Sequence, residues 1–93
     1  MMRKVTVEEF TQEVKDMAME VVPEEFEGVM AEMSKARVRY DEEDEEVIFC
    51  TGDYNHGGNA SMIIKTEVIE SIYKDEDGYH FTLNNDVTFS VSE

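Results

Sequence analysis

The soft or borderline metal ligands of this sequence are few: Cys50, His56 and His80, of which Cys50 is also a candidate nucleophile. A zinc site takes about four ligands, so these three would need an acidic fourth, and the spacing of Cys50 and His56 matches no zinc motif. Cys50 ends the apolar run 47–50, where a thiol is more often inert packing than a reactive group. We therefore expect no catalytic residue, no metal, no cofactor and no enzyme activity.

A second candidate for chemistry is the stretch 52–60, which consists almost entirely of turn-forming residues and predicts a long loop. Two adjacent glycines would let its backbone approach a small ligand closely. It lacks the glycine and lysine spacings of phosphate-binding loops. Two interpretations of this stretch stay open: a loop that binds no ligand, and a specific binding loop. In a binding loop the polar contacts would come from Tyr54, Asn55, His56 and Asn59.

Carboxylates are the most abundant polar groups, and six of them are consecutive in Asp41–Glu46. Against 8 Lys and Arg, the 23 Asp and Glu residues give a net charge of −15. Direct binding of nucleic acid or of an anionic membrane needs a positive surface, so both are disfavoured and a basic protein partner is favoured. Three interpretations of the acidic run stay open: a solvated hairpin tip, a surface for a basic partner, and a site for a hard cation such as Ca²⁺.

The N-terminal pattern predicts a helix over residues 7–21. Thr6 and Glu9 have the spacing of a capping box. Apolar residues then follow at three- and four-residue intervals, as on one face of a helix. Acidic residues recur beside them at Glu9, Glu13, Asp16 and Glu20, one charge per ~4–5 Å of helix axis.

Duplex DNA carries one charge per ~1.7 Å of axis, so imitation of DNA would need a second acidic row. That row would come from residues 24–32 or from the run 41–46. The predicted partner-binding surface comprises Glu9, Glu13, Asp16, Glu20, Glu24, Glu25, Glu27, Asp41, Glu42, Glu43, Asp44, Glu45 and Glu46.

The remaining pattern predicts a single α+β domain over residues 1–93, with a helical part of about 6–35 and a β part of about 36–92. Pro23 ends the first helix and suits the first turn of a second one over 23–35, which Gly28 weakens. Alternating or continuous apolar residues predict strands, the first two forming a hairpin with the acidic run at its tip. The expected fold is one or two N-terminal helices packed on a four- to five-stranded antiparallel sheet, a meander with strands near 36–40, 47–50, 68–74, 79–83 and 87–91. The stretch 62–65 is a further candidate for a short strand.

The expected function is that of a non-enzymatic, acidic protein-binding module. Small, very acidic chains without a catalytic motif are common among phage and mobile-element proteins that block host nucleases. We therefore expect a nucleic-acid-mimicking inhibitor of anti-CRISPR or anti-restriction type. The alternative is a small structural or regulatory domain that acts through an oligomer interface, such as a homodimer seam on the first helix, with acidity serving only solubility. The single cysteine, Cys50, allows no intrachain disulfide and favours the cytoplasm.

Overall fold

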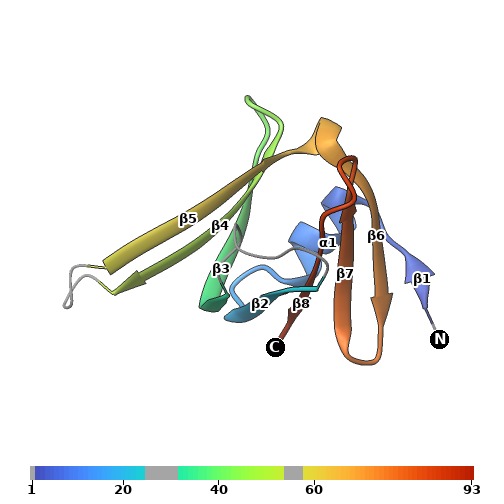
Figure 1. Ribbon diagram of the computed structural model, residues 1–93. Helices are drawn as coiled ribbons and strands as arrows, with labels where there is room; N and C mark the ends of the chain where they lie inside the picture. Colours follow the sequence, from blue (N-terminus) through green and yellow to red (C-terminus); the bar gives the residue numbers. More distant parts are fainter. Residues whose placement is uncertain (1, 25–31, 54–57) are drawn as a thin grey trace.

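The structure is a computed structural model that describes residues 2–24, 32–53 and 58–93 (Figure 1). The α+β class is confirmed, but the sheet has eight strands rather than four or five, and the described residues form one short α-helix. In chain order the elements are β1 (Arg3–Lys4), α1 (Val7–Glu13), β2 (Met19–Pro23), β3 (Met33–Asp41), β4 (Glu46–Asp53), β5 (Gly58–Lys65), the 3₁₀ turn η1 (Thr66–Val68), β6 (Ile69–Asp75), β7 (Gly78–Leu83) and β8 (Thr88–Ser92).

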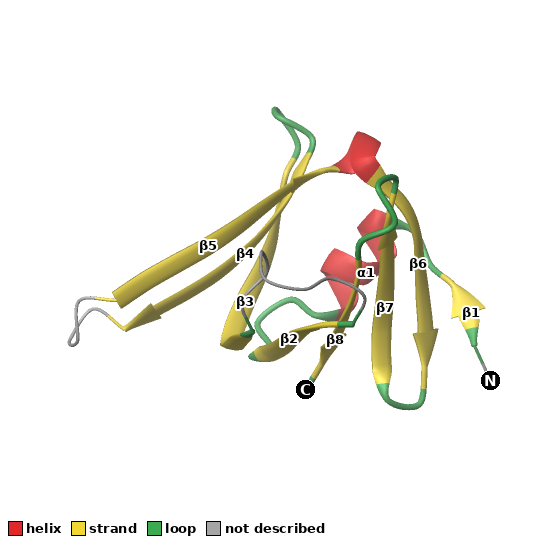
Figure 2. Cartoon of the chain, viewed as in Figure 1, coloured by secondary structure: helices red, strands yellow, loops and turns green. Residues whose placement is uncertain are grey.

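The strands form one antiparallel sheet in the order β1-β6-β7-β8-β2-β3-β4-β5. Hairpins join β3 to β4, β4 to β5, β6 to β7 and β7 to β8, as in the meander that the alternating sequence predicts. The sheet curves strongly, and α1 lies inside the curve between the β3–β4 pair and the β6–β7 pair (Figure 2). None of the helices described is long and apolar enough to cross a membrane.

The core is built around Phe10 of α1, whose side chain is fully buried. Its ring meets Tyr79 and Phe81 of β7 edge-on, at centroid distances of 4.9 and 4.8 Å. On the other side it packs 6.1 Å from Phe49 of β4. One helical side chain therefore joins the two halves of the curved sheet. The apolar stripe of this helix, considered as a homodimer seam, faces the core, with Phe10 and Val14 both buried.

The first helix begins where the sequence predicts, because Thr6 and Glu9 form the complete capping box. It ends at Glu13, however, not at residue 21. Asp16 follows in a turn with a positive φ of 65°, and the chain then extends as β2. Met19 and Val21 are both buried and alternate with less buried neighbours, as in a strand. The pairing of β2 with β3 and β8 overrides the helical spacing.

The predicted second helix over 23–35 is wrong at both ends. Pro23 belongs to β2, where it lies opposite Phe89 of β8. Met33 and Lys35 belong to β3, which begins before the predicted strand at 36–40 and ends at Asp41. Residues 25–31, with Glu25, Glu27 and Gly28, lie outside the described residues.

The predicted loop 52–60 is largely a β-hairpin. The β4–β5 register is continuous through Gly52 opposite Asn59 and Asp53 opposite Gly58. Tyr54, Asn55 and His56 of the proposed binding loop lie outside the described residues. Consecutive pairing overrides the turn-forming composition here, and the hairpin extends away from the body of the molecule (Figure 1).

Cys50, predicted to be a buried packing residue, is exposed on β4. Its neighbours Val47, Ile48 and Phe49 are all buried, as predicted for an apolar strand that is covered on both faces. The thiol position lies beyond the part of β4 that the core covers. Burial therefore does not extend to the end of the apolar run.

Candidate partner-binding surface

The acidic run forms the turn between β3 and β4, as predicted. We call Asp41–Glu46 the acidic tip. Asp41 Oδ1 accepts hydrogen bonds from the backbone N–H groups of Glu43 (3.0 Å) and Asp44 (3.2 Å). Glu45 takes a positive φ of 52° before the chain enters β4. The turn thus has a defined backbone, and the side chains of residues 42–45 are exposed.

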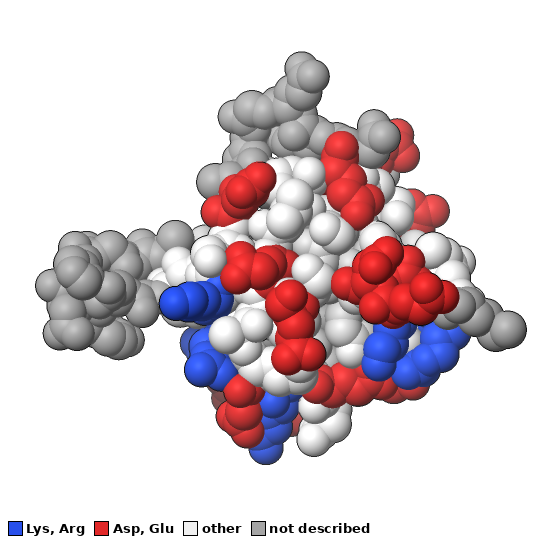
Figure 3. All heavy atoms as spheres, turned by 90° about the horizontal axis from the view of Figure 1, so that it is seen from below, with Lys and Arg blue, Asp and Glu red and all other residues white. Residues whose placement is uncertain are grey.

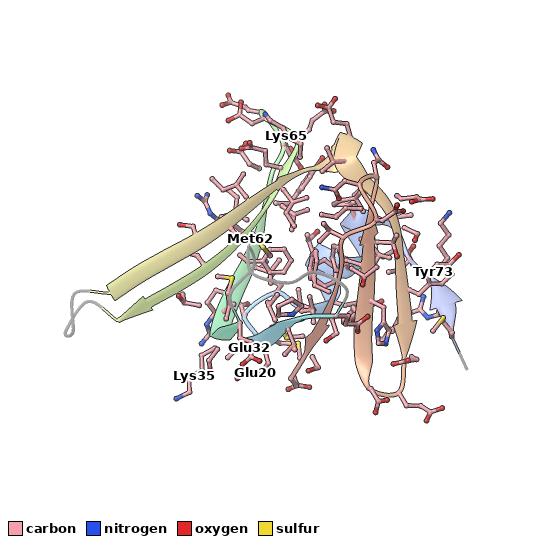
Figure 4. All side chains as sticks on the ribbon, viewed as in Figure 1. Glu20, Glu32, Lys35, Met62, Lys65 and Tyr73 are labelled. Carbon is pink, nitrogen blue, oxygen red and sulfur yellow. The ribbon has the colours of Figure 1, made fainter. Side chains whose placement is uncertain are left out.

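One cation pairs with the acidic tip. Lys65, at the end of β5, places Nζ 3.2 Å from Glu46 Oε2 and 3.4 Å from the carbonyl oxygen of Asp44 (Figure 4). This hydrogen bond to Glu46 raises the pKa of Lys65. Within residues 2–24, 32–53 and 58–93, no lysine or arginine forms an ion pair with Glu42, Glu43 or Glu45.

The charge of the acidic tip acts on the adjoining strand. The pKa of Tyr40 is raised, first by burial and then by the carboxylates of Glu8, Glu45, Glu42 and Asp41. Negative charge near a phenol disfavours the phenolate, so the carboxylates of the acidic tip contribute to this raised pKa. Arg37 and Arg39 of β3 do not cancel it through an ion pair among the described residues.

Three carboxylates of the tip also converge. Oxygens of Asp41, Asp44 and Glu46 lie within 4.8 Å of one another. Hard cations prefer such oxygens, but Ca²⁺ takes about six to eight of them, and Asp41 Oδ1 and Glu46 already have hydrogen-bond partners. This geometry does not by itself define a metal site.

The helical acidic residues face a different part of the molecule. Arg3 of β1 lies 3.6 Å from Glu9 and 3.1 Å from Glu13. Glu13 Oε1 also accepts hydrogen bonds from Tyr79 Oη (2.5 Å) and Lys74 Nζ (2.9 Å). These donors, Tyr79 first and Lys74 next, lower the pKa of Glu13 to about 2. Glu9 and Glu13 thus hold α1 to its neighbours.

The predicted acidic stripe is not a continuous row, because the helix ends before its last two members. Asp16 lies in the turn after α1, where its carbonyl oxygen accepts a hydrogen bond from Arg37. Glu20, on β2, accepts from Ser34 Oγ (3.1 Å) and the backbone N–H of Lys35 (3.4 Å). Figure 4 shows Glu20 beside Glu32 and Lys35, far from the acidic tip.

Glu24 follows β2, where its carboxylate meets His80 of β7 at 3.1 Å. The other ring nitrogen of His80 lies 2.9 Å from Asp75 Oδ2. Burial alone would lower the pKa of His80, but the hydrogen bonds to Glu24 and Asp75 raise it. The carboxylate of Glu24 therefore binds within the fold and does not extend the acidic tip into a longer row of charges.

A second acidic region lies at the opposite end of the molecule, beside the β6–β7 turn (Figure 1). It borders a groove of about 600 Å³ in which Met17, Met19 and Tyr79 supply apolar surface. Lys74 lines the groove with five carboxylates, those of Glu13, Asp75, Glu76, Asp77 and Glu93. Figure 3 views the molecule from this side and shows acidic side chains over much of the face.

No pattern in the sequence predicts this groove as an acidic region. Asp75–Gly78 lies between the predicted strands 68–74 and 79–83 and forms the hairpin turn that joins β6 to β7, but no pattern in the sequence connects its charge to another residue. The connection arises because the C-terminal residue of β8, Ser92, packs against Gly78, which brings Glu93 to the groove. The acidic residues of this turn were the local signal from which an acidic region could have been predicted.

Searches against protein-family models, curated proteins and solved structures return no match to this chain. The acidic tip has exposed carboxylates without a paired cation in the described structure, whereas the groove holds Lys74 and the bonded Glu13. The tip is accordingly the stronger candidate surface.

Proposed function

We propose that this protein is a non-enzymatic binding module that uses the acidic tip to engage a basic site on another protein. The observation that supports the proposal is the exposure of Glu42, Glu43 and Glu45, none of which forms an ion pair within the described part of the chain. Exposed carboxylates at one turn are well placed to meet lysine and arginine side chains. The net charge of −15 would accelerate encounter with such a partner at low salt.

The acidic tip is anchored by a well-paired hairpin. Residues 37–41 of β3 pair continuously with residues 46–50 of β4. Directly below the turn, Val47 and Phe49 are fully buried in the core. A surface that is already ordered loses less conformational entropy on binding, so the anchored turn favours affinity.

The finer proposal is that the tip occupies a site that normally binds nucleic-acid phosphates. The carboxylates of Asp41, Asp44 and Glu46 approach one another within 4.8 Å, and further exposed glutamates flank them. The carboxylates of the tip lie more densely than those of the predicted helical stripe. Their density is therefore closer to that of duplex DNA, which carries one charge per ~1.7 Å of axis. The partner class we propose is a nuclease or another basic nucleic-acid-binding protein.

The test compares two tagged variants with the wild type in pull-downs from a cell lysate. The tip variant carries Glu42→Gln, Glu43→Gln and Glu45→Gln, and it spares the hydrogen-bonding Asp41. The control variant removes three exposed charges elsewhere through Glu70→Gln, Asp77→Asn and Glu93→Gln. We expect one basic protein to be retained by the wild type and the control and lost by the tip variant.

The choice of eluent distinguishes binding to any basic site from binding to a site for nucleic acid. Salt should release the partner in either case, because the contact is ionic. A duplex DNA oligonucleotide at low salt should release it only if the tip and DNA share a site. Equal retention by both variants would contradict the role of the tip, and capture of many basic proteins in proportion to their abundance would contradict specific binding.

A further inference from the structure

The two edges of the sheet differ in length and charge. One edge is β1, which has two residues, Arg3 and Lys4. The other edge is β5, which has eight residues and pairs with β4 alone among the described strands. Although 33% of the chain is charged, residues 58–64 include no charged residue. Natural edge strands are usually short, charged, bulged or covered, because an open edge pairs with other strands.

The register shows which backbone groups of β5 are free to pair. The N–H of Thr66 donates to the carbonyl oxygen of Glu45 at 2.9 Å, so this position points toward β4. In an antiparallel ladder the direction of the backbone groups alternates along the strand. The N–H and C=O groups of Ser61, Ile63 and Lys65 therefore point to the open edge. The β4–β5 register contains no shift that would turn them away.

The side chains of β5 also suit an exposed pairing surface. Ile64 is buried against the core, and Met62 packs partly against it. Ile63 points to the other face and is 57% exposed, the largest value among the big apolar residues described. Figure 4 shows Met62 and Lys65 along this strand. The edge thus combines free backbone groups with an uncovered isoleucine and lacks a charged residue before Lys65.

We propose that β5 pairs in antiparallel fashion with β5 of a second copy of this chain. The twofold axis would pass through Met62, so that Ser61 lies opposite Ile63 of the second copy. In this register, residues whose backbone groups point to the open edge lie opposite each other. Residues 59–65 of one copy then pair with residues 59–65 of the other. The two sheets would then form one continuous sheet through a symmetric interface, the commonest kind in homo-oligomers.

Charge explains why a second copy fits this edge. Two chains of −15 repel each other, and β5 lets them meet without setting a carboxylate of one against a carboxylate of the other. Lys65 would lie opposite Asn59 at each end of the interface. Pairing of a single strand buries little area compared with a stable interface of ~1,200–2,000 Å², so we expect a weak dimer. Added salt should strengthen it by screening the net repulsion.

The test measures the mass of the untagged protein by sedimentation between ~10 µM and ~1 mM, the Kd range of weak association. We expect a monomer that becomes a dimer over this range, at lower concentration when salt is added. Ile63→Pro removes an outward N–H that β4 does not use, and Ile63→Thr keeps that N–H while removing apolar surface. The proline variant should stay monomeric at least tenfold above the wild-type midpoint, and the threonine variant should still dimerise.

Amide hydrogen exchange gives a test that needs no variant. The amides of Ser61, Ile63 and Lys65 should exchange more slowly as the wild-type concentration rises. A protein that stays monomeric to ~1 mM would overturn the proposal. So would dimers that leave these three amides unprotected, because the copies would then meet through another surface.

Discussion

Tyr79 of β7 donates its hydroxyl hydrogen to Glu13 of α1 across a distance of 2.5 Å. Lys74 of β6 donates to the same carboxylate oxygen, and Arg3 of β1 donates to the other one. A single carboxylate at the end of the helix therefore joins three strands. Directly beneath it, Phe10 packs edge-on against the ring of Tyr79. This polar cluster fixes the helix over the aromatic core.

Tyr79→Phe keeps the ring in the core and removes only its hydroxyl group. We expect the free energy of unfolding to fall by about 1.5–3 kcal/mol, the range for a hydrogen bond to a charged group. Urea denaturation measures this change. Tyr73→Phe is the matched control, because the side chain of Tyr73 is exposed and its hydroxyl group forms no hydrogen bond with the described residues. Equal effects of the two substitutions would show that the hydrogen bond to Glu13 does not contribute to the free energy of unfolding.

Glu13 should make the protein sensitive to acid. Its pKa in the folded state, about 2, lies below the ordinary value of 4.5 because Tyr79 and Lys74 donate to the carboxylate. Because the folded-state pKa lies below the unfolded-state pKa, the ionised carboxylate stabilises the fold fully at a pH above about 4.5. This stabilisation is lost as the pH falls from about 4.5 toward 2. Glu13→Gln should remove this part of the pH dependence. Unfolding free energies at a series of pH values test it, and an unchanged slope would contradict the assignment.

His80 should contribute with the opposite sign. Its raised pKa means that the protonated ring is favoured in the folded protein by Glu24 and Asp75. The stabilisation is fully present below the unfolded pKa of about 6.5 and is lost as pH rises through the folded value. In an NMR titration, Asp75→Asn and Glu24→Gln should each lower the pKa of His80. A pKa that neither substitution changes would show that the ring does not depend on this pair.

Gly78 closes the β6–β7 turn beside the C-terminal strand. Its φ is +140°, and a Cβ there would collide with the carbonyl oxygen of Val91. Gly78→Ala must therefore shift either the turn or β8, and we expect a loss of about 1–3 kcal/mol of stability. Asp77→Ala, in the same turn but exposed, is the control. Thermal unfolding of both variants checks the difference, which would vanish if the turn could relax without cost.

Features that depend on neighbouring residues were predictable from the sequence. The capping box of Thr6 and Glu9 requires only a three-residue spacing, and it forms as predicted. The acidic tip is also local, because both strands of its hairpin adjoin it in the chain. Likewise, the alternation of Tyr79, Phe81 and Leu83 indicated β7 correctly.

Features that depend on distant pairing were not predictable. Residues 19–22 fit both a helical and an alternating pattern, and the choice is made by hydrogen bonding of β2 to β3 and β8. The acidic groove likewise forms only when Glu93 comes beside the turn at Asp75–Gly78. Glu13 was assigned to a partner surface because nothing in the local sequence connects it to Tyr79.

The pull-down with the two charge variants is the sharpest test of binding through the acidic tip. If the acidic tip is the binding surface, the wild type and the Glu70, Asp77 and Glu93 control will retain the same basic protein, which salt releases. The Glu42, Glu43 and Glu45 variant will lose it. Retention by the tip variant at the wild-type level would contradict the account, because the binding energy would then come from another part of the molecule.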